Sequence, residues 1–394
     1  MERISTLFLT YLRRLAELER RGDAREESHY GALQELLEGY AVASGRPGVR
    51  VTVMPKRTEA GVVVDLQVWW GARIVGYVEA KRPEANLDAA ERSDQMRRYL
   101  AAFPNVLLTD FYEFRRYRQE ERAVERAAIE RPESRFYADH LEEVLGEAPV
   151  AALLDRFLDF AAPRPASAAA LAVGLANRAR LLTTAIEELL AEDTEKTSEL
   201  AGFYQAFSEY LIEGLTPRDF ADLYAQTLAY GLLAARWQAP GDFELRTVLD
   251  HIPRTNGILR EAFRYIALGD PRPRIAWIVD DIVQLLAVSP VRELLERGDH
   301  GGMGRDPILY FYETFLAQYD AHLRKRRGVY YTPRPVAGYV VRSVDALLRE
   351  RLGRPDGLAD GGVTLLDPAA GTLTFVAEAF RCAVSGYRAR HGAG

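Results

Sequence analysis

Three apolar, β-branched runs between residues 49 and 81 restrict the fold of this chain more than any other feature. They read "VRVTVMP", "GVVVDLQVWW" and "RIVGYVEAKRP", and glycine and proline separate them, which is typical of neighbouring strands in one sheet. Before them, apolar residues three and four apart predict helices in the first forty residues. A polar helix over 88–103 and strands over 105–110 and 113–118 follow. The pattern predicts an α/β domain over residues 1–160, with a mixed sheet flanked by helices.

Composition sets the outer limits. With 394 residues, 48% of them hydrophobic, the chain is long enough for two or three domains. Its single cysteine, Cys382, excludes a disulfide framework and a cysteine-based metal site. We find no signal peptide and no apolar run of membrane-spanning length, so we expect a cytoplasmic protein without a membrane partner.

The rest of the chain falls into two further parts. Residues 161–320 carry almost only helical periodicity after a Pro/Ala-rich linker, which predicts an all-α connector. Residues 321–394 then predict a proline-marked loop, an amphipathic helix, a Gly/Asp-rich loop and a buried strand at "VTLLDPAAG". This last order is typical of the start of a Rossmann-like α/β domain. Because the sheet neighbours of that strand would be missing, we expect the apolar side chains of Val363 to Leu366 to be partly exposed or frayed.

Three charged residues lie within the strand-like runs. Asp65 interrupts "VVVDLQVWW", and Glu79 and Lys81 stand two apart at the end of the next run, so they share one face of a strand. A hairpin around "WGARI" would bring Asp65 beside them. Two close carboxylates repel each other unless a divalent cation binds both, and a neighbouring lysine can orient or deprotonate a metal-bound water. Two carboxylates and a lysine in this arrangement are suited to metal-assisted phosphodiester hydrolysis.

In an alternative interpretation without a functional role, Glu79 and Lys81 are a solvated ion pair at the end of a strand. The rarity of lysine argues against it. Only Lys56, Lys81, Lys196 and Lys325 occur among 51 basic residues, and a compact ammonium differs from a guanidinium in how readily its pKa adjusts.

Asp65, "EAK" at Glu79 to Lys81, and "QMRRY" at Gln95 to Tyr99 together resemble the PD-(D/E)xK nucleases with a downstream QxxxY motif. The resemblance implies Asp65 and Glu79 as ligands of Mg²⁺, Lys81 as the partner of the attacking water, and double-stranded DNA as substrate. Gln95 and Tyr99, four apart on one helix face, would place the DNA backbone. The resemblance also implies that an acidic residue of the first helix completes the metal site, and Glu35 is our candidate. An ordinary amphipathic helix with its tyrosine turned inward is the alternative for Gln95 and Tyr99.

Two later segments, "GVYYTP" and "LLDPAAGTLTF", resemble consecutive motifs of N6-adenine DNA methyltransferases. The resemblance implies contacts to S-adenosylmethionine from one set of residues: Tyr331, Thr332, Pro333, Asp367, Ala369, Gly371 and Phe375. Two departures stand out, because Ala370 replaces a usual cysteine and Leu373 stands where a second glycine is expected. If the turn requires a positive φ there, leucine would impair cofactor binding.

In order, these parts resemble single-chain restriction-modification enzymes of the type IIG and type ISP-like group. We therefore expect the N-terminal part of a longer bifunctional protein, with a whole nuclease and a truncated, inactive methyltransferase, because no ribose-binding acid or (N/D/S)PP(Y/F) motif follows Phe375. The alternative is a non-catalytic helical scaffold or a DNA-binding subunit of a phage-defence complex. The basic runs at Arg115 to Arg118 and Arg324 to Arg327 are expected to contact DNA phosphates. The sequence leaves the oligomeric state open.

Overall fold

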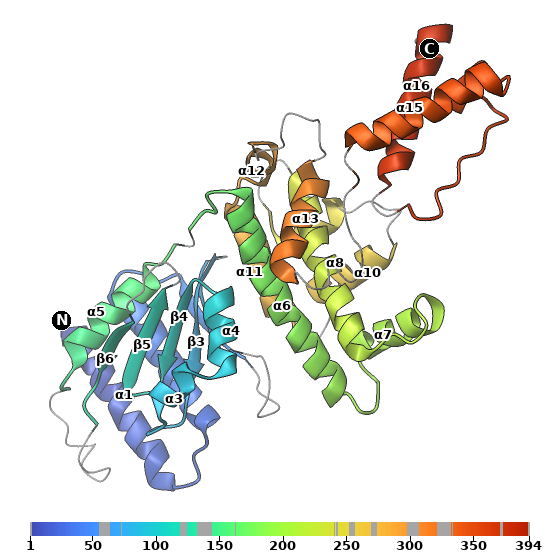
Figure 1. Cartoon of the computed structure of the whole chain (residues 1–394). Helices are drawn as coiled ribbons and strands as arrows, with labels where there is room; N and C mark the ends of the chain where they lie inside the picture. The colour runs from blue at the N-terminus through green and yellow to red at the C-terminus, as the bar shows by residue number, and fades with distance from the viewer. Residues whose placement is uncertain are drawn as a thin grey trace. The chain divides into compact units, whose positions relative to one another are not determined.

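Figure 1 shows a computed structural model of the chain, which forms two compact units. The first comprises Met1–Arg164 and Asn177–Ser289, and the second comprises Pro165–Ala176 and Pro290–Gly394. The structure describes residues 2–392 except for the following positions: 55–63, 72, 119–123, 132–143, 162, 240, 242, 252–256, 269–273, 298–306, 321–331, 333 and 371–372.

The first unit contains a six-stranded mixed sheet in the order β1-β2-β3-β4-β5-β6. Its strands are β1 (Val49–Val53), β2 (Leu66–Trp70), β3 (Arg73–Ala80), β4 (Asn105–Thr109), β5 (Glu113–Arg118) and β6 (Glu125–Ala128). Neighbours are antiparallel except for β3 and β4, which are parallel. The predicted β2–β3 hairpin is confirmed, and its register carries a shift between Val68 and Trp69.

The parallel pair β3 and β4 requires a crossover, because a tight turn joins only antiparallel strands. Two short helices supply it, α3 (Leu87–Glu91) and α4 (Asp94–Ala102). The sequence predicted one continuous helix here. Ser93 divides it, since its extended backbone cannot continue α3 and its side chain accepts a hydrogen bond from the Met96 N–H as the N-cap of α4.

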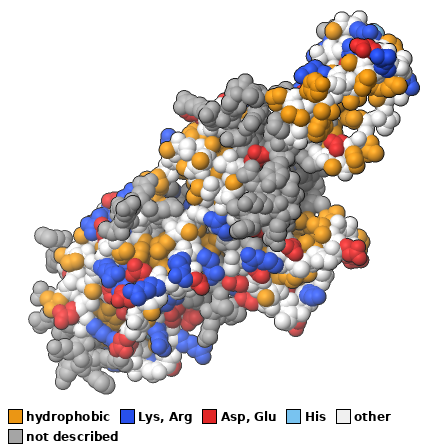
Figure 2. Space-filling view, in the orientation of Figure 1, with side chains coloured by type: hydrophobic (Ala, Val, Ile, Leu, Met, Phe, Trp, Pro, Cys, Tyr) orange, Lys and Arg blue, Asp and Glu red, His pale blue; other side chains and the backbone are white. Residues whose placement is uncertain are grey.

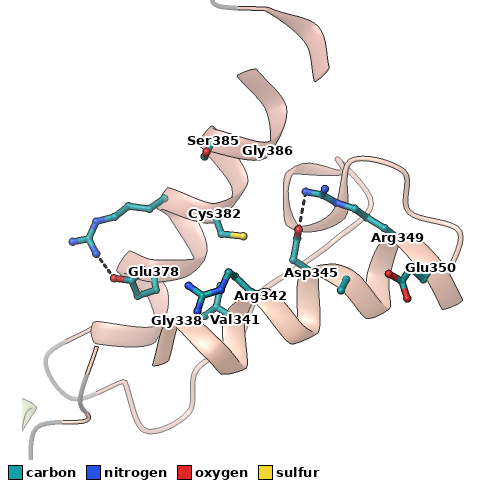
Figure 3. A pocket seen from close by; sticks show the side chains of 12 residues that line it. Gly338, Val341, Arg342, Asp345, Arg349, Glu350, Glu378, Cys382, Ser385 and Gly386 are labelled. Atoms are coloured by element: carbon teal, nitrogen blue, oxygen red, sulfur yellow. Dashed lines mark hydrogen bonds and ion pairs between the residues drawn. The ribbon is translucent and has the colours of Figure 1, made fainter. Parts of the chain in front are cut away.

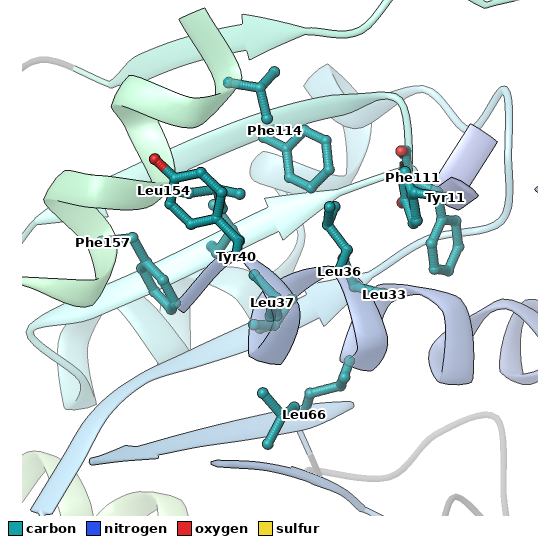
Figure 4. Packing of buried hydrophobic residues seen from close by; sticks show 14 of the residues in the cluster. Tyr11, Leu33, Leu36, Leu37, Tyr40, Leu66, Phe111, Phe114, Leu154 and Phe157 are labelled. Carbon is teal, nitrogen blue, oxygen red and sulfur yellow. Dashed lines mark hydrogen bonds between the residues drawn. The ribbon is translucent and has the colours of Figure 1, made fainter. Parts of the chain in front are cut away.

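One face of the sheet packs against three helices: α1 (Glu2–Arg21), α2 (Tyr30–Ala43) and α5 (Glu147–Leu158). A single-turn helix, η1 (Glu26–His29), leads into α2. Figure 4 shows the resulting core, where Leu36, Leu37 and Tyr40 of α2 lie among strand residues such as Leu66 and Phe114. Burial of these apolar side chains stabilises the α/β layer by roughly 1.5–3 kcal/mol for each fully buried large residue.

Between residues 161 and 320 the described secondary-structure elements are all helices, as the periodicity predicts. After α5, the helices of the first unit are α6 (Ala168–Glu192), α7 (Glu199–Tyr210), α8 (Pro217–Gln238), α9 (Leu245–His251), α10 (Gly257–Leu268) and α11 (Ala276–Val288). The division between the units falls within α6. Sequence-encoded caps start two of them: Ser198 caps α7, and Thr216 caps α8 with Pro217 directly following.

The opposite face of the sheet meets α11. Trp277 is 2% exposed and its ring lies 5.8 Å from that of Tyr77 on β3 and 5.5 Å from that of Phe103, the residue after α4. The compact first unit therefore contains the sheet and helices of the middle segment together. We define the connector helices as α6 to α11.

The second unit contains α12 (Val291–Arg297), α13 (Pro307–Tyr319), α15 (Arg334–Arg351), η3 (Gly357–Ala359) and α16 (Thr374–His391). The strand predicted at Val363 to Leu366 is not formed. Leu365 and Leu366 are 52% and 83% exposed, which agrees with the expected exposure of this segment in the absence of sheet neighbours. A strand needs a neighbour to satisfy its N–H and C=O groups, and the described part of this unit contains no other strand. None of the described helices is both long and apolar enough to span a membrane.

Candidate functional site

The C-terminal end of β3 carries a buried acid next to a lysine. Glu79 is 1% exposed, and its Oε1 accepts a hydrogen bond from Lys81 Nζ at 2.5 Å. The Lys81 side chain is 23% exposed, so it reaches from this buried carboxylate towards solvent. Its backbone N–H donates to the Thr109 carbonyl at 2.7 Å, which holds Lys81 against the end of β4.

Asp65 lies directly before β2 and is fully buried. Its Oδ2 accepts a hydrogen bond from the Ala80 N–H at 2.7 Å, and its Oδ1 accepts one from the Tyr30 hydroxyl at 2.6 Å. The contact to Ala80 joins Asp65 to the residue between Glu79 and Lys81. The hairpin therefore assembles two buried carboxylates and one ammonium where β2 begins and β3 ends.

Glu26, in η1, is an acidic residue of this site that the sequence reasoning missed. Its Oε1 lies 3.0 Å from the Tyr30 hydroxyl, and its Oε2 accepts a hydrogen bond from the Arg82 N–H at 3.0 Å. Burial and the charges of Asp65 and Glu26 raise the pKa of Tyr30 far above its usual range, so the phenol stays protonated as a donor. The available signal was spacing, since Glu26 precedes Tyr30 by about one helical turn.

Glu35, the sequence-based candidate for the third acid, lies elsewhere. Its carboxylate is 60% exposed and pairs with Arg14 of α1 at 3.5 Å. α2 itself carries two glutamates, Glu35 and Glu38, and Glu26 precedes it in η1. The position of each residue on its helix, rather than composition, decides which glutamate approaches Asp65. The structure thus replaces Glu35 by Glu26 as the acid near Asp65.

Gln95 and Tyr99 share one face of α4, as their spacing predicts, and Gln95 Nε2 donates to the Tyr99 hydroxyl at 3.0 Å. Tyr99 is fully buried, and burial followed by the charges of Glu79 and Asp65 raises its pKa well above its usual value. Its ring therefore lies beneath the surface near the two carboxylates, as the inward-turned alternative expects. Only the half-buried Gln95 of this pair can meet a ligand at the surface.

The donor set at β3 fits a hard divalent cation. Within the described residues no three His, Cys, Asp or Glu side chains are grouped closely enough to hold one ion together. Asp65 and Glu79 supply two carboxylates, and Mg²⁺ commonly binds through one or two carboxylates while keeping several waters. Each carboxylate can accept about four interactions, so the bonds to Tyr30, Ala80 and Lys81 are compatible with a bound ion.

The basic run at Arg115 to Arg118 is not the phosphate-binding surface that the sequence suggested. Arg115 is 4% exposed and pairs with Asp88, Glu91 and Glu113 at 2.6–2.9 Å. Arg116 is 3% exposed and pairs with Glu125 at 3.0 Å. Acidic neighbours on α3 and β6 thus neutralise both guanidinium groups, and Figure 2 shows red and blue side chains intermingled over this part of the molecule. The second basic run, 324–327, lies outside the described residues.

The residues assigned to S-adenosylmethionine are only partly within the described structure. Tyr331, Pro333 and Gly371 lie outside it. Thr332, Asp367 and Phe375 are half-buried, and Ala369 is exposed, with its N–H donating to Asp367 Oδ1 at 3.1 Å.

Leu373, the residue in place of the second glycine, has φ of 60°. The turn therefore uses the left-handed conformation for which glycine is best suited, and leucine adopts it at a cost of about 1–2 kcal/mol.

Figure 3 shows a cavity of about 590 Å³ between α15 and α16. Arg342, Asp345 and Arg349 of α15 and Glu378 and Cys382 of α16 line it. The Asp345 carboxylate is already hydrogen-bonded within the protein, because it accepts from Arg349 at 2.7 Å and from the Leu358 N–H at 2.8 Å. None of the four described cofactor candidates lines this cavity, so it is not the site that the methyltransferase motifs imply.

Comparison with protein-family models and with curated proteins gave no match. Among solved structures, the chain is similar to one titled "cryoEM structure DrdV-DNA complex", with 19% sequence identity and a TM-score of 0.39. The similarity covers 97% of this chain and 36% of that chain, so the present chain spans about a third of its length.

Proposed function

We propose that this chain is a Mg²⁺-dependent DNA endonuclease and forms the N-terminal part of a restriction-modification protein that also carries an adenine-N6 methyltransferase. The observation that supports the nuclease is the buried pair Asp65 and Glu79 with the Lys81 ammonium 2.5 Å from Glu79. Burying carboxylates is costly unless cations compensate them, and such arrangements are concentrated at functional sites.

In this proposal Asp65 and Glu79 hold the cation, and the Lys81 ammonium orients the attacking water. Only the neutral amine form of Lys81 would accept the proton of that water. A bound Mg²⁺ would supply charge stabilisation of the phosphate and acidify that water. Tyr30 keeps Asp65 in place by donating to Oδ1, while the Ala80 N–H fixes Oδ2. Both contacts orient the carboxylate before any ligand arrives, which is the condition for efficient metal-assisted hydrolysis.

The nucleic-acid substrate is supported by charge next to the site. Arg98 and Arg97, both exposed, lie on α4 beside Gln95, which is half-buried. Arg97 pairs with Asp94, whereas Arg98 presents its charge on the same short helix. Exposed arginines of this kind contact phosphates without reading the base sequence.

Metal titration together with DNA cleavage tests the proposal. The intact chain is expected to nick or cut plasmid DNA only with Mg²⁺ or Mn²⁺, and a chelator should stop it. Asp65→Asn is expected to weaken Mn²⁺ binding by about tenfold or more, because amides are poorer ligands than carboxylates. Asparagine still offers an acceptor to Ala80 and a donor to Tyr30, which preserves the local hydrogen bonds.

Glu35→Gln is the matched control, since it makes the same acid-to-amide change at an exposed position paired with Arg14. It should bind Mn²⁺ like the parent. Equal binding by Asp65→Asn and the parent would contradict the nuclease assignment. A parent that binds no metal and cuts no DNA would instead favour the non-catalytic scaffold or DNA-binding subunit.

We also expect the chain to bind S-adenosylmethionine weakly and to transfer no methyl group to DNA. Leu365 and Leu366, in the motif that resembles the cofactor-binding strand, are exposed, and Leu373 strains the following turn. If two polar contacts between the protein and S-adenosylmethionine are lost, the affinity for the cofactor falls by roughly a hundredfold or more. Calorimetry should therefore show no saturation below the millimolar range. Tight binding that Asp367→Ala abolishes, with methyl transfer, would contradict this expectation.

A further inference from the structure

A buried ion pair of the connector helices reaches into the sheet of the first unit. Asp281 of α11 pairs with Arg178 of α6, and its Oδ1 accepts a hydrogen bond from the Tyr77 hydroxyl of β3 at 2.5 Å. Tyr77, Asp281 and Arg178 are 1%, 5% and 6% exposed.

Tyr77 is directly linked to the candidate active site by its position in β3. It stands two residues before Glu79, and residues two apart in a strand point to the same face. A strand is extended and stiff, with two residues spanning about 7 Å, so a shift of Tyr77 is carried to Glu79 and Lys81. The hydroxyl of Tyr77 therefore holds the catalytic strand to α11.

Trp277, one turn before Asp281 on α11, contacts a second element of the site. Its ring lies 5.5 Å from Phe103, whose own ring lies 4.0 Å from Tyr77 and 6.0 Å from Tyr99. Tyr99 in turn accepts the hydrogen bond from Gln95. One face of α11 thus supports both β3, with Glu79, and α4, with Gln95 and Tyr99.

Stability alone is a poor explanation for this network. Replacing a buried ion pair with apolar residues of similar volume is often neutral or stabilising, because desolvation cancels much of the attraction. A polar network does impose one geometry, since each donor must meet its acceptor. An apolar contact would fix the position of β3 less specifically than this hydrogen-bonded network does.

We propose that Asp281, held by Arg178, is a positioning residue of the nuclease that acts through Tyr77 on Glu79 and Lys81. The catalytic geometry then depends on the connector helices, and residues 1–160 are not a self-sufficient nuclease. A movement of α11 would change the cleavage rate without touching DNA or metal. This inference rests on the proposed nuclease function.

The test removes one hydroxyl at a time from the intact chain. Tyr77→Phe deletes the bond to Asp281, and Tyr40→Phe is the matched control, because the buried Tyr40 hydroxyl donates to the Ala151 carbonyl at 2.8 Å on the opposite face of the sheet. Tyr77→Phe is expected to lower kcat for DNA cleavage about 10- to 100-fold with unchanged KM, because small displacements of reacting groups have effects of that size. Tyr40→Phe should leave kcat unchanged.

Amide hydrogen exchange, measured without metal or DNA, provides a readout that does not depend on activity. Exchange in β3 and α4 should accelerate in Tyr77→Phe relative to Tyr40→Phe. Asp281→Asn, which keeps an acceptor for Tyr77 but loses the charge facing Arg178, should show the same pattern and serves if Tyr77→Phe fails to fold. A parent that cuts no DNA would overturn the proposed function, while exchange would still decide whether α11 holds β3. Equal kcat and equal exchange in Tyr77→Phe and Tyr40→Phe would overturn this inference.

Discussion

Replacing Lys81 with methionine is expected to lower the rate of metal-dependent DNA cleavage by about 10²–10⁴-fold, the usual contribution of a positioned acid-base group. Lys81 Nζ lies 2.5 Å from Glu79 Oε1, so the ammonium is held beside one of the two carboxylates proposed to bind the cation. Methionine keeps most of the aliphatic stem and removes the charge. Initial rates at saturating Mg²⁺ and low salt, together with the unfolding midpoint, would measure the effect.

Lys196→Met is the control for this experiment. Lys196 is an exposed lysine between α6 and α7, away from the acidic residues of the sheet. It undergoes the same chemical change and should cleave DNA at the parental rate. Parental cleavage by Lys81→Met under identical metal and salt would show that the active site has been assigned to the wrong residues.

Replacing Gly146 with alanine is expected to destabilise the first unit by about 2–4 kcal/mol, combining left-handed backbone strain with steric overlap. Gly146 precedes α5 with φ of 86°, and a Cβ there would lie 2.0 Å from the Ala128 carbonyl oxygen of β6. The obstacle is backbone, so α5 or β6 must move. Urea unfolding monitored by tryptophan fluorescence, which reports on Trp69 and Trp70 of β2 as well as Trp277, would measure the loss.

Gly45 offers a control with the same backbone conformation. Its φ is also 86°, but a Cβ there would meet no atom within 4 Å. Gly45→Ala should therefore cost only the conformational strain, about 1–2 kcal/mol. The difference between the two variants isolates the steric overlap at β6. Equal losses would mean that β6 and α5 separate without cost and that the junction does not hold the layer together.

Short-range patterns predicted much of this molecule. Apolar, β-branched runs separated by glycine identified β1 to β3, and helical periodicity identified the long helices of the middle segment, because burial selects apolar residues locally along each element. The same-face relation of Glu79 and Lys81 followed from strand geometry, and their contact at 2.5 Å agrees with it. The roles of these residues in catalysis stay predictions.

Charge patterns were misleading because burial cannot be read from a local run. The run that contains Arg115 and Arg116 predicts a basic surface, yet both side chains are buried against acidic residues. Asp88 and Glu91 lie 27 and 24 positions from Arg115 in the chain, and Glu125 lies nine positions from Arg116. In the same way, Glu35 and Glu26 are both glutamates in the N-terminal helical segment, and the sequence alone does not distinguish their positions. Only the placement of η1, with the Tyr30 hydroxyl beside both carboxylates, brings Glu26 near Asp65.

The amino-acid order was sufficient for the sheet-forming runs, the helical middle segment and the placement of Asp65, Glu79 and Lys81 where one strand begins and its neighbour ends, since each depends on residues a few positions apart. Two features required long-range packing. The exposed segment at Val363 to Leu366 forms no strand, because a strand depends on hydrogen bonds to a neighbour rather than on its own side chains. The contact of Tyr77 with Asp281 joins residues 204 positions apart, and no local pattern contains such a pair.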